Sequence, residues 1–130
     1  MKETILIVED NPLNLELATD LLEAAGFRVA QAGTGEEGVR MATKLQPSLV
    51  LMDLSLPGMD GLAATRTLKA NSATEHLVIV ALTAHAMRGD AEIAIRAGCD
   101  GYISKPIDTR AFPRQIRSFM TIPTLCKPKH

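Results

Sequence analysis

The sequence of 130 residues is poor in cysteine, aromatic residues and net charge. Its two cysteines, Cys99 and Cys126, are too few and too isolated for a disulfide framework or a zinc site, and we expect Cys99 to be a small buried residue. Aromatic residues make up 3% of the chain and tryptophan is absent, which argues against a surface for stacking nucleic-acid bases. The formal net charge is −1, so no strong field attracts nucleic acid or a membrane surface.

Long apolar runs are also missing. No run approaches the length of a membrane span, and the N-terminus lacks the pattern of a signal peptide, so we expect a cytoplasmic protein without a membrane partner. Hydrophobic residues make up 46% of the chain and charged residues 22%, which is typical of one globular domain with a substantial core. We place the domain at residues 1–120 and a C-terminal tail or linker start at residues 121–130.

Short apolar runs alternate with helical patterns five times along the chain. The predicted strands are residues 4–8, 27–31, 48–53, 77–82 and 101–104. The predicted helices are residues 12–25, 35–45, 62–70, 90–97 and 109–120. Parallel strands need covered crossover connections, so this alternation predicts an α/β fold, a doubly wound parallel sheet of five strands with helices on both faces. The strand 27–31 has a more polar side and suits an edge of the sheet.

Three helices carry more detailed predictions. The second helix should begin with a capping box formed by Thr34 and Glu37. In the last helix, Pro113 lies beyond the first turn if Asp108 is the N-cap, which implies that the helix starts late or kinks. The apolar residues expected on the buried face of the first helix are Leu17, Ala18, Leu21, Leu22 and Ala25.

Chemically active residues stand at the carboxyl ends of four of the five predicted strands. Ligands of open parallel sheets bind beyond these ends, so we expect the side chains to gather on one rim. Each residue alone has an ordinary structural explanation, such as a helix N-cap, but the matched set favours a functional site. The residues are Glu9 and Asp10 after the first strand, Asp53 at the end of the third, Thr83 after the fourth and Lys105 after the fifth.

Three carboxylates in one place raise each other's pKa values, and a hard divalent cation such as Mg²⁺ removes that cost. Together with the ammonium of Lys105, the cation would make the rim fit a dianionic tetrahedral group. Phosphoryl transfer requires this arrangement, and a carboxylate such as Asp53 can itself be the nucleophile. Thr83 would then donate a hydrogen bond to a phosphoryl oxygen.

Four segments occur in the order and spacing of a known family: ILIVEDN (5–11), LMDLSLPGMDG (51–61), ALTA (81–84) and GYISKP (101–106). With them, the sequence resembles the receiver domain of two-component response regulators, the CheY-like family, over residues 3–120. The resemblance implies a flavodoxin-like (βα)5 fold with strand order 2-1-3-4-5. Residues 10–14 and 83–90 are most similar to stand-alone receivers of the DivK type and to receivers of hybrid histidine kinases.

The resemblance assigns a role to each residue of the phosphoryl site. Asp53 would be the phosphoacceptor, and Lys105 would pair with the phosphoryl group. The implied ligands of Mg²⁺ are Asp10, Asp53 and the backbone carbonyl of Ser55, with Glu9 acting through a water molecule.

The resemblance also implies a switch. Thr83 and Tyr102 would form the switch pair, in which Thr83 moves toward the phosphoryl group and Tyr102 turns inward. Ser55 and His85 would modulate the lifetime of the acyl phosphate. The bond between Lys105 and Pro106 would be cis, a conformation that is accessible mainly before proline.

Two partner surfaces follow from this reading. A histidine kinase or a histidine phosphotransfer protein would donate the phosphoryl group, and we expect it to dock on Leu13 and Leu15 of the first helix. A downstream protein effector would bind the face made by the fourth helix, the last strand and the last helix. The residues expected on this face are Arg96, Tyr102, Phe112 and Gln115.

Other functions remain possible at this point. The chain could be a receiver excised from a hybrid histidine kinase that acts in a phosphorelay. An aspartyl-nucleophile phosphatase would be an enzyme, whereas a receiver catalyses only its own phosphorylation and dephosphorylation. Phosphatases of the haloacid dehalogenase type carry the motif Asp-x-Asp after the first strand. This chain has Glu9-Asp10 there, which argues against a phosphatase of that type. A flavodoxin-like carrier would need a phosphate-binding loop there, and a phosphate-independent pseudo-receiver would lack some of the five rim residues.

Overall fold

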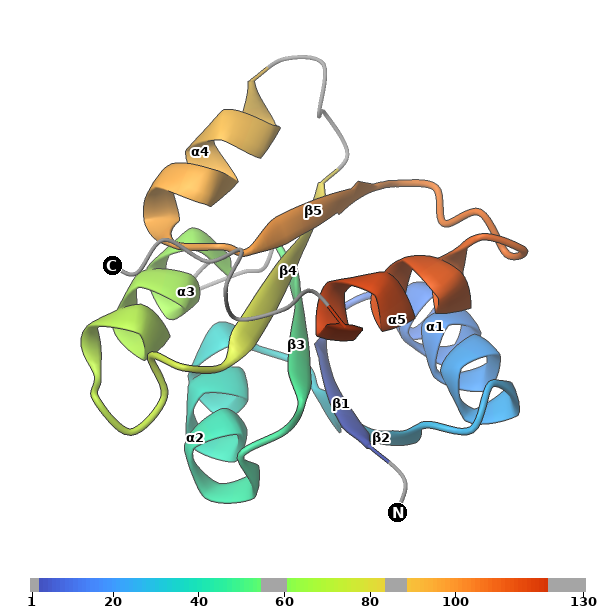
Figure 1. The fold of residues 1–130 in the computed structure, drawn as a ribbon, viewed down its shortest axis with the longest axis horizontal. Coiled ribbons are helices and arrows are strands. Elements are labelled where there is room, and N and C mark those ends of the chain that lie inside the picture. Colours follow the sequence, from blue (N-terminus) through green and yellow to red (C-terminus); the bar gives the residue numbers. More distant parts are fainter. Residues whose placement is uncertain (1–2, 55–60, 84–88, 122–130) are drawn as a thin grey trace.

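The computed structural model describes residues 3–54, 61–83 and 89–121, which form a parallel sheet of five strands covered by helices on both faces (Figure 1). The sheet order is β2-β1-β3-β4-β5, as predicted, with β2 at one edge. All five residues of the central strand β3 are buried, because both faces of the sheet are covered. The strands are β1 (Thr4–Val8), β2 (Arg28–Ala32), β3 (Leu49–Asp53), β4 (Val78–Thr83) and β5 (Gly101–Ser104).

The helices are divided between the two faces. Helices α1 and α5 pack on one face, and α2, α3 and α4 pack on the other, so the sheet separates two apolar cores (Figure 1). None of the described helices is long and apolar enough to cross a membrane. The helices are α1 (Pro12–Ala24), α2 (Gly35–Leu45), α3 (Gly61–Ala70), α4 (Asp90–Ala97) and α5 (Phe112–Thr121).

Side-chain caps fix the starts of two helices. The Asn11 side chain accepts hydrogen bonds from the backbone N–H groups of Leu13 and Asn14, at 2.9 and 3.1 Å, so α1 begins directly after the acidic pair that follows β1. Thr34 accepts from the N–H of Glu37 at 3.1 Å, as expected of a capping box. The second bond differs from that of a standard capping box, because Glu37 Oε1 accepts from the N–H of Gly33, at 3.0 Å, one residue before the N-cap.

One prediction for α1 is wrong. Leu17 was expected on the buried face, but its side chain is 38% exposed, whereas its neighbour Ala18 is buried. A helix turns 100° per residue, so a side chain next to the centre of the buried stripe is only partly covered by the sheet. The centre of the buried stripe passes through Ala18 and Leu22, which leaves Leu17 at its margin.

The last helix starts late, and Pro113 explains where. The Asp108 side chain accepts hydrogen bonds from the N–H groups of Arg110 and Ala111, at 3.0 and 3.2 Å, and so caps a turn that precedes the helix. Helix α5 then begins at Phe112, which makes Pro113 its second residue. Proline is tolerated in a first turn because its missing N–H has no helical acceptor there.

Candidate functional site

The strand register brings the predicted rim residues to one edge of the sheet. Val8 of β1 lies opposite Met52 of β3, so the next residues in register are Glu9 and Asp53. On the other side of β3, Asp53 lies opposite Leu82 of β4, and β4 in turn pairs with β5 up to Ser104. The predicted residues at this edge are Glu9 and Asp10 after β1, Asp53 at the end of β3, Thr83 at the end of β4 and Lys105 after β5.

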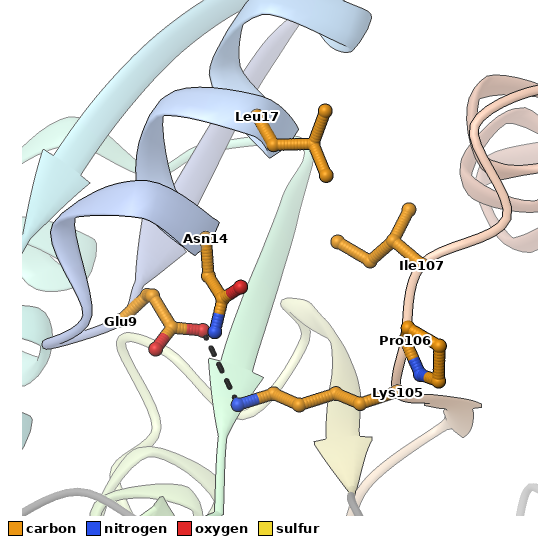
Figure 2. Close-up of a pocket in the computed structure, with 6 residues that line it drawn as sticks. All are labelled: Glu9, Asn14, Leu17, Lys105, Pro106 and Ile107. Carbon is orange, nitrogen blue, oxygen red and sulfur yellow. Dashed lines mark ion pairs between the residues drawn. The ribbon is translucent and has the colours of Figure 1, made fainter.

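Asp53 is a buried carboxylate with a cationic partner. Its side chain is 2% exposed, and its Oδ1 lies 3.2 Å from the Nζ of Lys105. The same ammonium lies 3.5 Å from Oε1 of Glu9 (Figure 2). One cation therefore serves two buried carboxylates. An unpaired charge at this depth would be strongly destabilising, and Lys105 therefore makes Asp53 tolerable at the end of a buried strand.

Glu9 is a buried carboxylate in an unfavourable electrostatic environment. Its side chain is also 2% exposed, and its Oε2 accepts a hydrogen bond from the N–H of Asn11 at 3.2 Å. Its buried Oε1 accepts no hydrogen bond from any residue that the structure describes. Burial, and next the neighbouring carboxyl group of Asp53, raise the pKa of Glu9 to about 7.

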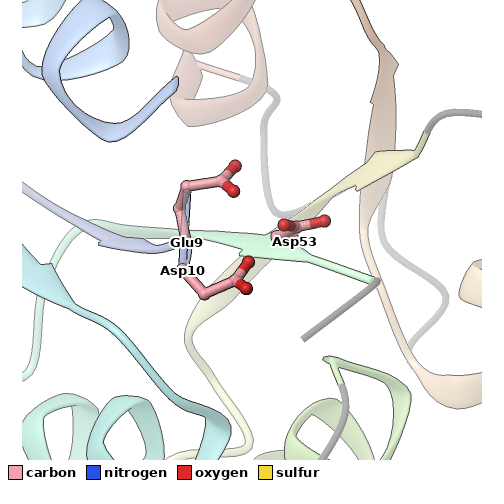
Figure 3. Close-up of side chains that lie close together, drawn as sticks. All are labelled: Glu9, Asp10 and Asp53. Atoms are coloured by element: carbon pink, nitrogen blue, oxygen red, sulfur yellow. The ribbon is translucent and has the colours of Figure 1, made fainter. Parts of the chain in front are cut away.

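Glu9, Asp10 and Asp53 form a cluster that fits a metal ion. Each offers one carboxylate oxygen, and these oxygens lie within 4.8 Å of one another. Figure 3 shows the carboxylates of Glu9 and Asp10 reaching from the end of β1 toward Asp53 at the end of β3. A cation here would relieve the repulsion of three carboxylates and provide a partner, directly or through water, for the unsatisfied oxygen of Glu9. All donors are hard oxygens, which suits Mg²⁺.

The two predicted switch residues lie on one face of the sheet. Tyr102 of β5 lies opposite Ala81 of β4, and Thr83 is two residues further along β4, so both side chains point toward the face that α4 covers. Thr83 is 1% exposed, whereas Tyr102 is 44% exposed. The structure therefore places Tyr102 in an outward position and Thr83 at the rim.

A pocket of about 310 Å³ opens between α1 and the segment after β5 (Figure 2). The sequence predicted Leu13 and Leu15 as a docking patch beside the acidic residues of the rim. Leu13 is 76% exposed, but Leu15 is half-buried and packs on the core, and Leu17 lines the pocket instead. The spacing of four residues between Leu13 and Leu17 is the signal that could have identified this pair. The residues that line the pocket are Glu9, Asn14, Leu17, Lys105, Pro106 and Ile107.

A second, open pocket of about 360 Å³ lies between α4 and β5 and is lined by Glu92, Ile95, Arg96 and Tyr102. Two of the four residues predicted for the effector face, Arg96 and Tyr102, therefore line one surface. Gln115 of α5 is exposed. The prediction for Phe112 is wrong, because its side chain is completely buried between α5 and the sheet.

Three further predictions can be placed. The bond between Lys105 and Pro106 is cis, as expected. Cys99 is buried, and burial raises the pKa of its thiol to about 11, so it is an inert core residue as expected. Ser55 and His85, the predicted modulators, and Cys126 lie outside the described residues.

Comparison with known proteins agrees with this geometry. The family model for the response regulator receiver domain matches residues 5–117. The polar-differentiation response regulator DivK of Brucella ovis is 41% identical over 120 residues, which cover 92% of this chain and 98% of the relative.

Solved structures are similar as well. The receiver domain of sensor histidine kinase PA1611 from Pseudomonas aeruginosa, solved with magnesium coordinated in the active-site cleft, has a TM-score of 0.85 and 35% identity. The match covers 92% of this chain and 98% of the PA1611 receiver chain. The chemotaxis response regulator CheY4 of Vibrio cholerae shares the fold with a TM-score of 0.86 at 20% identity, covering 92% of this chain and 99% of that chain. The chain therefore belongs to the response regulator receiver domain family of two-component signalling.

Proposed function

We propose that Asp53 accepts a phosphoryl group from a phosphohistidine donor and that the resulting charge switches the surface formed by α4, β5 and α5. The observation that supports this assignment best is the position of Asp53. It is buried at the carboxyl edge of the sheet, 3.2 Å from Lys105 Nζ and beside the carboxylates of Glu9 and Asp10.

The transfer step uses groups that the chain itself supplies. A carboxylate oxygen of Asp53 attacks the phosphorus, an O–P bond forms, and the N–P bond of the phosphohistidine breaks, with its electron pair returning to the imidazole. The ammonium of Lys105 is in place to neutralise the phosphoryl group, and the hydroxyl of Thr83 donates a hydrogen bond to it. Asp10 and Asp53 would hold Mg²⁺, with the Ser55 carbonyl and with Glu9 acting through water. When bound, the ion supplies further positive charge to the phosphoryl oxygens.

Loss of the phosphoryl group is also a reaction of the chain on itself. A water oxygen attacks the phosphorus, the O–P bond to Asp53 breaks, and inorganic phosphate leaves with the carboxylate restored. Ser55 and His85 would set the rate by controlling the approach of that water. No external substrate is turned over, so the chain acts as a switch and not as an enzyme on other molecules.

The two states of Asp53 differ by about one negative charge and three acceptor oxygens. Thr83 senses this difference because its hydroxyl lies at the same rim, and its movement would let the exposed Tyr102 ring turn inward on the same face of the sheet. An effector would then bind the surface that includes Arg96, Tyr102 and Gln115.

The phosphoryl donor must reach the rim over α1. The exposed Leu13 and Leu17 and the pocket between α1 and Ile107 form an apolar surface next to Lys105, with the half-buried Leu15 beneath it. We place a histidine kinase or a histidine phosphotransfer protein on this surface. The similarity to the PA1611 receiver domain favours, as a second possibility, that the chain is a receiver from a hybrid kinase and passes its phosphoryl group along a phosphorelay.

The direct test is labelling by a small phosphodonor, radiolabelled acetyl phosphate, with Mg²⁺. We expect up to one phosphoryl group per chain, an acid-stable and base-labile bond, and loss of labelling in a chelator. Asp53→Asn should take up no label, whereas Asp20→Asn, which removes an exposed carboxylate of α1, should label like the wild type. Labelling that persists in Asp53→Asn would refute the assignment.

Two further measurements separate the alternatives. Incubation with a generic phosphomonoester should give no catalytic turnover, and repeated turnover would favour a phosphatase. Phosphotransfer profiling against purified, radiolabelled histidine kinases and phosphotransfer proteins of the source organism should then identify the donor. Transfer onward from labelled Asp53 to a phosphotransfer protein would favour the phosphorelay.

A further inference from the structure

Three consecutive residues after α4 fasten its C-terminal end to α3. Gly98 packs on the aliphatic stem of Lys69, since a Cβ atom at Gly98 would lie 2.8 Å from Lys69 Cγ. The Sγ of Cys99 lies 3.8 Å from Oγ1 of Thr65 in the interior. The carboxylate of Asp100 lies 3.1 Å from Lys69 Nζ. The end of α4 is therefore held by apolar packing, a buried polar contact and an ion pair.

The ion pair is part of a fully satisfied network. Lys69 Nζ donates to the carbonyls of Glu75 and Leu77, at 3.1 and 2.8 Å, as well as to Asp100, which uses all three donors of an ammonium. Asp100 also exchanges two hydrogen bonds with Ile79. Its carboxylate accepts from Ile79 N–H at 2.8 Å, and its own N–H donates to the Ile79 carbonyl at 2.7 Å. One carboxylate thus connects α3, β4 and the turn before β5.

Among the residues that the structure describes, the opposite end of α4 makes no comparable set of contacts. Its N-cap is Gly89, which has a φ of 91° and, as a glycine, offers no side chain to cap the helix. Of the α4 side chains that the structure describes, only Ala94 and Ala97 are buried, and alanine contributes little apolar area. Ile93 and Ile95 are 42% and 48% exposed. The helix is therefore held strongly at its C-terminal end and makes fewer buried contacts through its other described side chains, those of residues 92–96.

The two ends also lie at opposite edges of the sheet. α4 follows β4 and runs back alongside it, so its N-terminal end is at the edge that carries Asp53, and its C-terminal end is near the start of β5 (Figure 1). Asp100 immediately precedes Gly101, the first residue of β5, and stands two residues before Tyr102. The strong attachment is therefore remote from the phosphoryl site and adjacent to the strand of the effector face.

We infer that the Lys69–Asp100 ion pair is the pivot of α4: it holds the C-terminal end of α4 and the start of β5 in place while the end nearest Asp53 moves. This inference rests on the proposed function, in which phosphorylation of Asp53 changes the surface of α4 and β5. Lys69 acts as a positioning residue, because it touches neither the phosphoryl group nor the metal site. Because the C-terminal end is fixed, the movement caused by phosphorylation is confined to the N-terminal half of α4, and β5 keeps its register in the sheet.

The test is amide hydrogen exchange of the full chain, with and without Mg²⁺ and beryllium fluoride, which mimics a phosphoryl group on a carboxylate. In the wild type, the mimic should change the exchange of residues 89–95 by at least about threefold and leave residues 98–101 within error. A comparable change at both ends of α4 would overturn the pivot. If acetyl phosphate fails to label Asp53, the proposed function fails instead, so the two failures are distinguishable.

Variants test whether Lys69 is responsible. Lys69→Met keeps the aliphatic stem but removes the ammonium, and the change caused by the mimic should then extend through residues 98–101. The matched control is Lys44→Met, in the last turn of α2, which should keep the wild-type pattern. Asp100→Asn keeps an acceptor for Ile79 and removes only the charge, so it serves if Lys69→Met does not fold. An unaltered pattern in folded Lys69→Met, or in Asp100→Asn, would refute the role of the ion pair.

Discussion

At the scale of single residues, the described part of the site contains more negative charge than Lys105 can balance. Lys105 contributes one positive charge against the buried carboxylates of Glu9 and Asp53 and the exposed carboxylate of Asp10. Burial, and next the neighbouring carboxyl group of Asp53, raise the pKa of Glu9. A site in this condition has affinity for a proton or a divalent cation, whichever is available.

The first prediction concerns the pH dependence of the metal-free protein. The pKa of Glu9 is about 7 in the folded chain and 4.5 as the reference for the unfolded chain, so folding takes up a proton between these values. Glu9 therefore favours the folded state below pH 4.5, and this contribution is lost as the pH rises toward 7. Urea unfolding in a chelator should show that Glu9→Gln gains stability over the wild type across this range, up to roughly 3 kcal/mol.

The control for this prediction is Glu16→Gln, which neutralises an exposed carboxylate on α1 and should show no such trend. Saturating Mg²⁺ at pH 8 should stabilise the wild type more than Glu9→Gln, because the cation replaces the missing proton. A difference between Glu9→Gln and wild type that does not change with pH would contradict the electrostatic account of Glu9.

At the scale of elements, the site depends on how closely α3 approaches the end of β3. A Cβ atom on Gly61, the first residue of α3, would collide with the backbone carbonyl of Asp53 and come within 2.9 Å of the Leu54 Cα. The backbone that carries the phosphoacceptor therefore packs directly against the start of a helix. No side chain larger than hydrogen fits between them unless one of the two backbones shifts.

The second prediction follows from this close approach. Gly61→Ala should lower the free energy of unfolding by about 1–3 kcal/mol and should also slow the labelling of Asp53, because the Asp53 backbone must shift. Gly33→Ala is the matched control, since its Cβ atom would meet only Glu37 Oε1, at 4.0 Å. Chemical denaturation and acetyl phosphate labelling measure the two effects. If Gly61→Ala and Gly33→Ala have the same free energy of unfolding and label at the same rate, the close approach at Gly61 does not constrain the site.

At the scale of the whole molecule, charge is separated although the net charge is only −1. Helix α1 carries three exposed acidic residues, Glu16, Asp20 and Glu23, and no basic residue. The neighbouring α5 region carries exposed arginines, of which Arg117 donates a hydrogen bond to the carbonyl of Ala25 at the end of α1. The apolar surface around Leu17 thus lies between an acidic and a basic flank.

The third prediction is that phosphotransfer from a protein donor depends on salt. Oppositely charged flanks steer association, and salt screens them, so raising the salt from 50 to 500 mM should slow transfer by about tenfold. The combined variant Glu16→Gln, Asp20→Asn and Glu23→Gln should show a smaller salt dependence while labelling normally with acetyl phosphate. Transfer rates from the profiled donor at several salt concentrations measure this, and an unchanged salt dependence would exclude α1 from the encounter.

Much of this architecture was predictable because its determinants are local in the chain. Continuous apolar runs indicate strands buried on both faces, and polar residues directly after those runs must meet at one edge of a parallel sheet. The rim residues from Glu9 to Lys105 were identified in this way, and their identity and spacing indicated the family. The late start of α5 was also predictable, because the position of Pro113 in the sequence disfavours an earlier helix start.

Only the tertiary structure decided which side chains of each helix meet the core. Leu17 is exposed and Phe112 is buried because of how α1 and α5 are rotated about their axes relative to the sheet. Helical periodicity alone defines that rotation only to within some tens of degrees. The raised pKa of Glu9 and the pairing of Lys69 with Asp100, 31 residues apart, depend on neighbours that only folding brings together. The sequence by itself therefore determined the chemistry of the rim, whereas packing determined its electrostatic balance and the anchoring of α4.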